Sequence, residues 1–593
     1  MIKRLFDIVA TRNREEPDAV MLAAKENGNW KTYSCNEVWT TANHLATGIL
    51  SLGISRDLST PESQEKIAII APNRPEWIMT DIGVQLSGAV LTPIYPTVSV
   101  QDMEYILKEA ETHIVFIAGK ELYKRFKDSF AKTPSIKHIF SFDEIEGVRH
   151  WKELIQNQEP PSETHLDKIT EDTLATIIYT SGTTGNPKGV MLSHSNIVHN
   201  VQDSMCEFWF AEKNARALSF LPLNHIFERT VTYIYIHAAV AIYYAQSMET
   251  IGDNLKEVKP IVFTTVPRLL EKVYEKIVSK GRELKGLKHS LFFWALALAK
   301  KYDNINQGSL WYRLQLTIAN RLVFSKWREA LGGNVKAIVT GSAACQERLI
   351  RIFTAARIII MEGYGLTETS PVVSVNKFNS EDRRIGTIGP VIQNVEAKLA
   401  PDGEILVRGK NIMMGYYKNP QLTSEVIHDG WFHTGDIGTV VEDRFLKITD
   451  RKKEIFKTSG GKYVAPQVIE NKMKESLYIE QILVTGANKK FVTALVVPAF
   501  PYVRNYLNEK GLPVPETDED INKLKDVRYL IRNEINKYNA QFGHVEQVKK
   551  FRLLDREWTI DEGELTPSLK LKRKFIEEKY SNLIRELYGE EAS

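Results

Sequence analysis

Short apolar runs alternate with longer amphipathic segments through the first half of the chain. Residues 66–70 and 174–179 are mostly apolar and predict buried strands, whereas 38–50 repeats apolar residues at helical spacing. The same criteria predict further strands at 89–93 and 113–118, and helices at 76–86 and 99–110. Because strands that alternate with helices form parallel sheets covered on both faces, we predict an α/β fold with doubly wound sheets.

A second strand–helix–strand pattern appears later, with strands predicted at 335–340 and 357–361 and a helix at 346–355. Loops are predicted after both strands, at 341–344 and 362–369. In open parallel sheets, ligands bind beyond the carboxyl ends of the strands. We therefore expect both loops to face the same ligand.

From residue 388 to 417 the pattern changes to short strands separated by turns, which predicts a small β subdomain. After Asp450 the glycine content falls and charged residues become dense, so we place a domain boundary there. The remaining residues suffice for one small α/β domain.

Composition narrows the class of protein. A chain of 593 residues is too long for one core, and 77 Lys and Arg against 74 Asp and Glu give no field that attracts nucleic acid. Cys35, Cys206 and Cys345 lie far apart and predict neither a disulfide framework nor a metal site, which favours a reducing compartment. The apolar run 291–299 is about half of the ~20 residues that a membrane span needs. The start of the chain does not resemble a secretory signal, so we predict a cytoplasmic protein.

A glycine- and hydroxyl-rich string follows the strand at 174–179: Thr180-Ser181-Gly182-Thr183-Thr184-Gly185-Asn186-Pro187-Lys188-Gly189. Glycines let a backbone approach a ligand closely, hydroxyls donate hydrogen bonds and Lys188 adds a positive charge, all of which suit a polyphosphate. The string is not a Walker loop, because Gly189 follows the lysine where that pattern needs Ser or Thr. From composition alone, an ordinary surface loop remains equally acceptable.

The loop at 362–369 has candidates of its own. Tyr364 can stack on a base, Thr367 can donate to a phosphate, and Glu368 can hold a hard cation. Taken alone, Tyr364 would be better explained as a half-buried packing residue and Glu368 as a surface carboxylate.

A longer string runs from Asp429 through Asp436 to Gly438 and continues from Phe445 to Lys453. Asp436 can accept hydrogen bonds from both hydroxyls of a ribose, and Arg451 can donate to the same sugar. A plain β-hairpin explains the first half of this string but not the whole.

Together these strings resemble the motifs of the AMP-forming acyl-CoA synthetase, luciferase and peptide-synthetase adenylation superfamily. The phosphate loop, the 364–368 segment, the 429–453 string and a lysine-rich segment at 563–573 occur in that order. The similarity is closest to long-chain fatty acid:CoA ligases, which also share the 221–229 and 266–268 segments. The resemblance implies two steps: fatty acid and ATP give acyl-AMP and pyrophosphate, and coenzyme A then displaces AMP.

The resemblance also implies roles for individual residues, with ATP, Mg²⁺ and coenzyme A as the cofactor and co-substrates. The nucleotide would bind Thr180, Ser181, Gly182, Thr183, Thr184, Gly185, Gly341, Ser342, Ala343, Glu362, Gly363, Tyr364, Gly365, Asp436 and Arg451. The catalytic residues would be Lys570, Thr367 and Lys188; the metal would bind Glu368 and Thr183; the acyl substrate would meet His225 and Gly365; and Ser459, Gly460 and Gly461 would line the coenzyme A channel.

The family further implies a mobile C-terminal domain. Residues 1–449 would form the adenylate-forming domain, 450–454 a hinge centred on Asp450, and 455–593 a lid that carries Lys570. Many members have Gly-Lys at the catalytic lysine, whereas this chain has Leu569-Lys570, with Lys572 nearby.

Several alternatives stay open at this point. The acyl acceptor could be a carrier protein or the acid could be of another class, and a non-catalytic nucleotide-binding protein could share the fold. His225 could be a structural histidine. The lysine-rich segment 271–289 is best explained as a solvated helix face, with a basic surface resting on the inner face of a membrane as the second interpretation. A homodimer is an analogy with the family.

Overall fold

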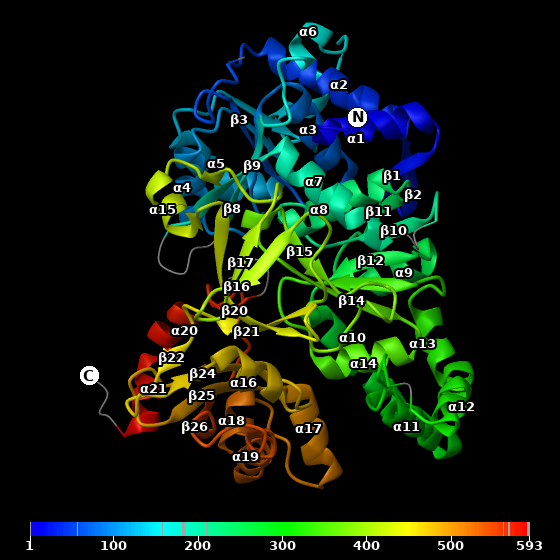
Figure 1. Cartoon of the computed structure of the whole chain (residues 1–593), viewed down its shortest axis with the longest axis vertical. Coiled ribbons are helices and arrows are strands. Elements are labelled where there is room, and N and C mark those ends of the chain that lie inside the picture. Colours follow the sequence, from blue (N-terminus) through cyan, green and yellow to red (C-terminus); the bar gives the residue numbers. More distant parts are fainter. Residues whose placement is uncertain are drawn as a thin grey trace. The chain divides into compact units, whose positions relative to one another are not determined.

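The computed structural model describes residues 2–55, 57–156, 158–180, 186–208, 212–306, 308–560, 562–566 and 570–589. The chain divides into two units (Figure 1). The first comprises Met1–Lys398, Leu406–His433 and Val441–Leu446; the second comprises Leu399–Ile405, Thr434–Val440 and Lys447–Ser593.

One sheet of the first unit has eight strands in the order β18-β9-β8-β4-β3-β5-β6-β7. Its strands are β3 (Lys66–Ile70), β4 (Val90–Pro93), β5 (Ile114–Ile117), β6 (His138–Ser141), β7 (Arg149–His150), β8 (Leu174–Thr180), β9 (Lys188–Ser193) and β18 (Gly415–Tyr416). The pairs from β7 to β8 are parallel, and every residue of the central strand β3 is buried, as expected for a strand covered on both faces.

The second sheet also has eight strands, in the order β15-β14-β13-β12-β10-β11-β1-β2. Its strands are β1 (Val20–Glu26), β2 (Asn29–Ser34), β10 (Arg216–Ser219), β11 (Ala241–Tyr244), β12 (Val262–Thr265), β13 (Ala337–Thr340), β14 (Ile359–Gly365) and β15 (Val372–Val375). The six strands from β1 to β14 are parallel, whereas the edge strands β2 and β15 pair antiparallel.

Helices connect these strands. They are α1 (Leu5–Glu15), α2 (Cys35–Ser51), α3 (Pro75–Leu86), α4 (Val100–Glu109), α5 (Lys120–Ala131), α6 (Glu163–Leu166), α7 (His194–Met205), α8 (Ile226–His237), α9 (Ile251–Val258), α10 (Pro267–Glu283), α11 (Gly286–Lys300), α12 (Leu310–Ala319), α13 (Ser325–Ala330), α14 (Glu347–Ala355) and α15 (Pro420–Val426). The prediction of an α/β fold with a large N-terminal part is confirmed.

A smaller sheet of five strands follows, with the order β16-β17-β20-β19 and β21 beside β20. Its strands are β16 (Glu396–Leu399), β17 (Glu404–Arg408), β19 (Ile427–His428), β20 (Trp431–Val441) and β21 (Phe445–Arg451). The predicted small β subdomain is therefore present.

The second unit has a three-stranded sheet, β24-β25-β26, and the two-stranded ribbon β22-β23. Its elements are β22 (Phe456–Lys457), β23 (Tyr463–Val464), α16 (Pro466–Met473), β24 (Ile479–Thr485), β25 (Val492–Pro498), α17 (Phe500–Glu509), α18 (Asp518–Lys523), α19 (Lys525–Asn539), β26 (Val548–Leu553), α20 (Arg573–Lys579) and α21 (Ser581–Tyr588). Apolar side chains cover both faces of the three-stranded sheet in two clusters, one containing Val496 and Ile531 and the other Val497 and Trp558.

Candidate functional site

The glycine-rich string connects two antiparallel strands. Thr180 at the end of β8 pairs with Lys188 at the start of β9, so the strands on either side of the string are antiparallel neighbours. Helix α7 follows β9, and Ser193 and Asn196 form the capping box at its start. Ser181, Gly182, Thr183, Thr184 and Gly185 lie outside the described residues.

Lys188 lies beside two residues that come from distant parts of the chain. Its Nζ is 5.4 Å from the ring centre of Tyr416, and the Tyr416 hydroxyl donates a hydrogen bond of 2.9 Å to Oε1 of Glu368. The strand pairing of β18 with β9 and the bond from Met413 N to Glu368 O hold these three segments together. The predicted residues Lys188 and Glu368 are thus brought together, through a tyrosine that sequence reasoning missed.

Glu368 fits a magnesium ion that is held mainly by substrate phosphates. Among the described residues there is no group of three or more His, Cys, Asp or Glu that could hold a metal by itself. Mg²⁺ is commonly bound through one or two carboxylates together with phosphate oxygens and waters. A single carboxylate that is oriented by Tyr416, the same tyrosine that contacts Lys188, meets that requirement.

The two loops at the carboxyl ends of β13 and β14 are adjacent, as the strand–helix–strand pattern predicts. Thr340 pairs with Glu362, and a Cβ on Gly341 would lie only 3.2 Å from the carbonyl oxygen of Gly363. Ser342 has a φ of +67°, a conformation that non-glycine residues rarely adopt and that is common in binding loops. Ala343 lies in the same loop.

Glu362, Gly363, Tyr364 and Gly365 are strand residues and not the loop that the sequence predicted. Antiparallel pairing with β15 extends β14 to Gly365 and supplies hydrogen bonds that a loop would lack. This pairing leaves Tyr364 9% exposed and Thr367 8% exposed at the strand end.

Glu362 is a buried carboxyl at the base of these loops. Its Oε1 accepts a hydrogen bond of 2.7 Å from the backbone N–H of Cys345, and burial raises its pKa to about 8. A carboxyl that stays protonated near neutral pH places no negative charge beside an anionic ligand.

His225 is the N-cap of α8. Its Nδ1 accepts a hydrogen bond of 3.1 Å from the backbone N–H of Phe227, so the side chain has a structural role whatever else it contacts. One turn into α8, Arg229 forms a fully buried ion pair that sequence reasoning missed. Its guanidinium donates to both carboxylate oxygens of Asp81. The partners are 148 residues apart, so no local pattern indicates the pair.

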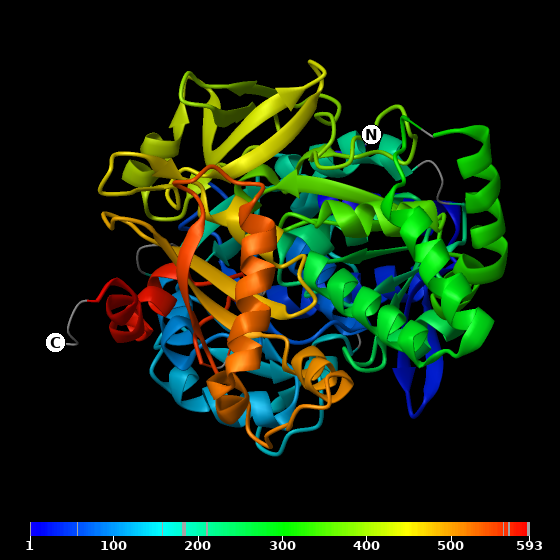
Figure 2. The same ribbon diagram turned by 90° about the horizontal axis from the view of Figure 1, so that it is seen from below.

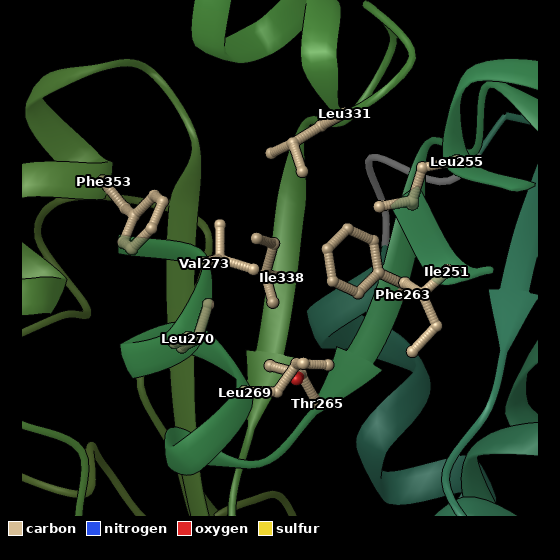
Figure 3. A pocket seen from close by; sticks show the side chains of 10 residues that line it. All are labelled: Ile251, Leu255, Phe263, Thr265, Leu269, Leu270, Val273, Leu331, Ile338 and Phe353. Carbon is tan, nitrogen blue, oxygen red and sulfur yellow. The ribbon is translucent and has the colours of Figure 1, made fainter. Parts of the chain in front are cut away.

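A small apolar cavity of about 20 Å³ lies beside β12 and β13 (Figure 3). Its lining consists of Ile251, Leu255, Phe263, Thr265, Leu269, Leu270, Val273, Leu331, Ile338 and Phe353. This volume holds roughly one water molecule and is too small for an acyl chain.

The second unit contains Asp436, Arg451 and Asp450. The Asp436 side chain is almost fully buried, and its Oδ1 lies 3.2 Å from Nε of Arg451, so the two predicted ribose ligands are neighbours. The Asp450 side chain is buried beside Glu454 and Glu470; burial is the main cause that raises its pKa to about 7.

The segment predicted to line the coenzyme A channel is a tight turn next to the β22-β23 ribbon. Gly461 N–H donates to Thr458 O at 2.9 Å, and Ser459 N–H donates to Lys489 O at 3.0 Å. Gly461 has a φ of +77°, which favours glycine, whereas a Cβ on Gly460 would meet only Thr458 Oγ1, at 3.9 Å.

Two hydrogen bonds join Lys570 to Thr566. Thr566 N–H donates to Lys570 O at 2.8 Å, and Lys570 N–H donates to the Thr566 hydroxyl at 3.1 Å. Three residues later, Arg573 binds both carboxylate oxygens of Glu470 at 2.8 Å, and its Nε lies 3.4 Å from Glu454. Sequence reasoning missed Arg573 as an anchor because its partners are about a hundred residues away.

Comparison with known proteins supports the motif assignment. The family described as AMP-binding enzyme matches residues 9–417, and its C-terminal domain matches residues 453–592. The chain is 33% identical to the long-chain-fatty-acid–CoA ligase FadD15 of Mycobacterium bovis, over 98% of this chain and 97% of the relative. It is 31% identical to long chain acyl-CoA synthetase 3 of Arabidopsis thaliana, over 98% and 91%.

Solved structures agree on the fold. The adenylation domain of a carboxylate reductase from Mycobacterium chelonae superposes with a TM-score of 0.78 at 20% identity, over 99% of this chain and 91% of that one. O-succinylbenzoate coenzyme A synthetase from Bacillus subtilis, in complex with ATP and magnesium ion, gives 0.68 at 18% identity, over 96% and 98%. No helix in the described ranges is both long and apolar enough to cross a bilayer. The chain belongs to the AMP-binding enzyme family, within the AMP-forming acyl-CoA synthetase superfamily.

Proposed function

We propose that this protein activates long-chain fatty acids with ATP and transfers the acyl group to coenzyme A. The observation that carries the proposal is the identity of 33% with a long-chain fatty acid ligase over nearly the full length of both chains. The carboxylate oxygen of the acid attacks the α-phosphorus of ATP, and pyrophosphate leaves. The thiol of coenzyme A then attacks the acyl carbon, and AMP leaves with the bonding electron pair while the thiol loses its proton.

The first step concentrates negative charge around one phosphorus, so preorganised cations and donors are the main need. Lys188 and the 181–185 string would bind the phosphates, Thr367 would donate to the α-phosphate, and Lys570 would neutralise charge that develops there. Mg²⁺, held by Glu368 and Thr183, would supply positive charge to the phosphate oxygens. A fatty carboxylate is already ionised near neutral pH, so no general base is required.

The nucleotide would lie against the carboxyl ends of β13 and β14. Tyr364 would stack on adenine, with Gly341, Ser342, Ala343, Glu362, Gly363 and Gly365 forming the adjoining backbone. Asp436 and Arg451 would bind the ribose. The burial of Asp436 and its contact with Arg451 support this assignment, because they hold the acceptor oxygens in fixed positions.

We further propose the domain arrangement 1–449, 450–454 and 455–593, with rotation about Asp450 between the two steps. Lys570 would serve adenylation, and Ser459, Gly460 and Gly461 would line the coenzyme A channel in the second step. His225 and Gly365 would border the acyl entrance.

The experiment is a panel of acids from acetate to very long fatty acids, measured as AMP release with and without coenzyme A. We expect AMP release with long-chain acids that depends on coenzyme A. An acyl-carrier protein replaces coenzyme A in a parallel series. Absence of pyrophosphate exchange into ATP with every acid would overturn the proposal, and transfer to the carrier protein alone would change the acceptor.

We also propose that the protein is cytoplasmic, forms a homodimer and makes peripheral contact with the inner face of a membrane. The fatty substrate of the relatives supports the membrane contact, because such acids partition into bilayers. Cell fractionation tests the location and sedimentation velocity tests the dimer.

A further inference from the structure

A line of large apolar side chains is exposed along α12 and the helical turns that follow it. Leu310 is 82% exposed, Trp311 66%, Leu314 52%, Ile318 42% and Leu322 52%. Spacings of three and four residues place them on one helical face. Apolar side chains clustered on a surface indicate an interaction site, unlike single exposed ones.

The opposite face of the same segment is firmly packed. Phe324 and Trp327 are buried, the Trp327 ring lies 6.1 Å from that of Phe292 in α11, and the Tyr312 hydroxyl donates to Leu298 O at 2.9 Å. In both views α11 and α12, drawn in green, lie at the edge of the first unit (Figures 1 and 2). The exposed line therefore belongs to an ordered helix pair.

The segment that carries this face is rich in basic residues. Between Leu284 and Arg328 the chain has one acidic residue, Asp303, which is paired with Arg351 at 3.2 Å. The same range has eight basic residues: Lys285, Lys288, Lys300, Lys301, Arg313, Arg321, Lys326 and Arg328. Five of them, Lys285, Lys288, Lys301, Arg313 and Arg321, are exposed and make no ion pair with any described acidic residue.

We infer that this lipid-facing surface, consisting of Leu310, Trp311, Leu314, Ile318 and Leu322 with their neighbouring cations, rests on an anionic bilayer. The apolar side chains would enter the boundary between headgroups and acyl chains, while the long basic side chains reach the lipid phosphates. The inference rests on the proposed peripheral contact and names the surface that makes it.

The charge argues against a second copy as the partner. Two copies joined through this face would bring the same unpaired cations together, which is unfavourable, whereas an anionic bilayer neutralises them. The apolar side chains of this surface are on α12 and the turns after it, beyond the lysine-rich segment 271–289 that the sequence indicated. Two of the neighbouring cations, Lys285 and Lys288, belong to that segment.

The test is co-sedimentation of the full-length protein with vesicles. We expect binding to vesicles of phosphatidylglycerol and phosphatidylcholine at low salt, weaker binding at high salt, and little binding to phosphatidylcholine alone. The triple variant Leu314→Ser, Ile318→Ser, Leu322→Ser should lower the partition coefficient by about tenfold or more, because it removes most of the apolar area. The double variant Arg313→Gln, Arg321→Gln should lower it by roughly fivefold for each cation.

The matched control is the double variant Tyr529→Ser, Val545→Ser, which removes exposed apolar side chains from the second unit and should bind vesicles as the wild type does. All substituted side chains are exposed, so unfolding temperatures should be unchanged. Activity on detergent-dispersed acid should also be unchanged in the triple variant, which separates this inference from the catalytic proposal.

Each contrary result has a distinct meaning. A wild-type protein that ignores anionic vesicles would overturn both the surface and the peripheral contact. Equal binding by the triple variant would overturn the surface alone. A triple variant that changes from dimer to monomer while its vesicle binding is unaffected would identify the face as an interface between copies and overturn the inference.

Discussion

The hydroxyl of Tyr416 is the contact that fixes the direction of the Glu368 carboxylate. Metal-binding side chains depend on such partners, and their loss commonly weakens metal affinity. Tyr416 also keeps its ring beside Lys188, so one side chain connects the residue proposed for the metal with the residue proposed for the phosphates.

We predict that Tyr416→Phe raises the Mg²⁺ concentration needed for half-maximal acyl-AMP formation by about tenfold, because the carboxylate loses an orienting hydrogen bond. The ring beside Lys188 remains, so ATP binding without metal should change little. Tyr417→Phe is the control, since the buried hydroxyl of Tyr417 has no hydrogen-bond partner in the described part of the chain. An unchanged Mg²⁺ dependence in Tyr416→Phe would separate Glu368 from the metal.

The Glu362 carboxyl predicts a pH dependence of stability. Its pKa is raised to about 8 by burial, so the folded protein retains a proton that the unfolded chain releases near its ordinary pKa of 4.5. The stabilisation is complete at pH values below the ordinary pKa and is lost as the pH rises toward 8.

We therefore predict that the free energy of unfolding of Glu362→Gln, relative to the wild type, increases between pH 5.5 and 8 by on the order of 1 kcal/mol per pH unit. Urea denaturation at four pH values measures the difference. Glu329→Gln, at an exposed carboxylate, is the control and should follow the wild type at every pH. Parallel curves for Glu362→Gln and the wild type would contradict the burial argument.

At the scale of elements, the sequence predicts what is local. The strand at 66–70 and the helix end at Leu86 match β3 and α3 because apolar periodicity and flanking prolines are local signals. Prediction from sequence fails where strand pairing determines the structure. Gly363 to Gly365 belong to a strand because they pair with β15, and the end of the string after β8 forms the start of β9, which pairs with β8.

The candidate site follows the same division. Single motifs indicate Lys188, Glu368 and Asp436, but Tyr416 and Arg573 acquire their roles from partners that are 48 and 119 residues away. The exposed face of α12 was missed as well, because apolar residues at helical spacing are equally typical of a buried helix.

Arg573 anchors the lysine segment at the start of α20. It binds the buried Glu470 of α16 with two hydrogen bonds and donates to Val484 O at 2.9 Å. Removal of one partner of a buried pair leaves the other charge uncompensated, which costs about 3–5 kcal/mol.

We predict that Arg573→Met lowers the free energy of unfolding by that amount and slows acyl-AMP formation. The double variant Arg573→Met, Glu470→Gln should recover most of the stability but not the rate, because the segment that carries Lys570 stays unanchored. Thermal unfolding and single-turnover adenylation measure the two effects. The exposed neighbour Lys574→Met is the control. Recovery of both properties in the double variant would show that Arg573 has a purely structural role.

At the scale of the whole molecule, the two proposed half-reactions depend on two different segments of the second unit. Lys570 is hydrogen-bonded to Thr566, and Gly460 lies in the turn beside β22. If the unit presents these segments in turn, damage to one should spare the step served by the other.

We predict that Lys570→Ala slows acyl-AMP formation by about 10²–10³-fold, the usual cost of losing a charge-stabilising donor, yet largely spares thioester formation from supplied acyl-AMP. Gly460→Leu should do the reverse, because a bulky side chain there would block the coenzyme A channel, while the backbone of Gly460, unlike that of Gly461, does not require glycine. Lys572→Ala tests whether Lys570 is the correct lysine and should retain both steps. Pyrophosphate exchange measures the first step and thioester release from acyl-AMP measures the second. Each variant alters one segment, and both variants are assayed for both steps. Loss of both steps in either variant would refute the division of labour. Opposite losses in the two variants would require the second unit to work in two orientations.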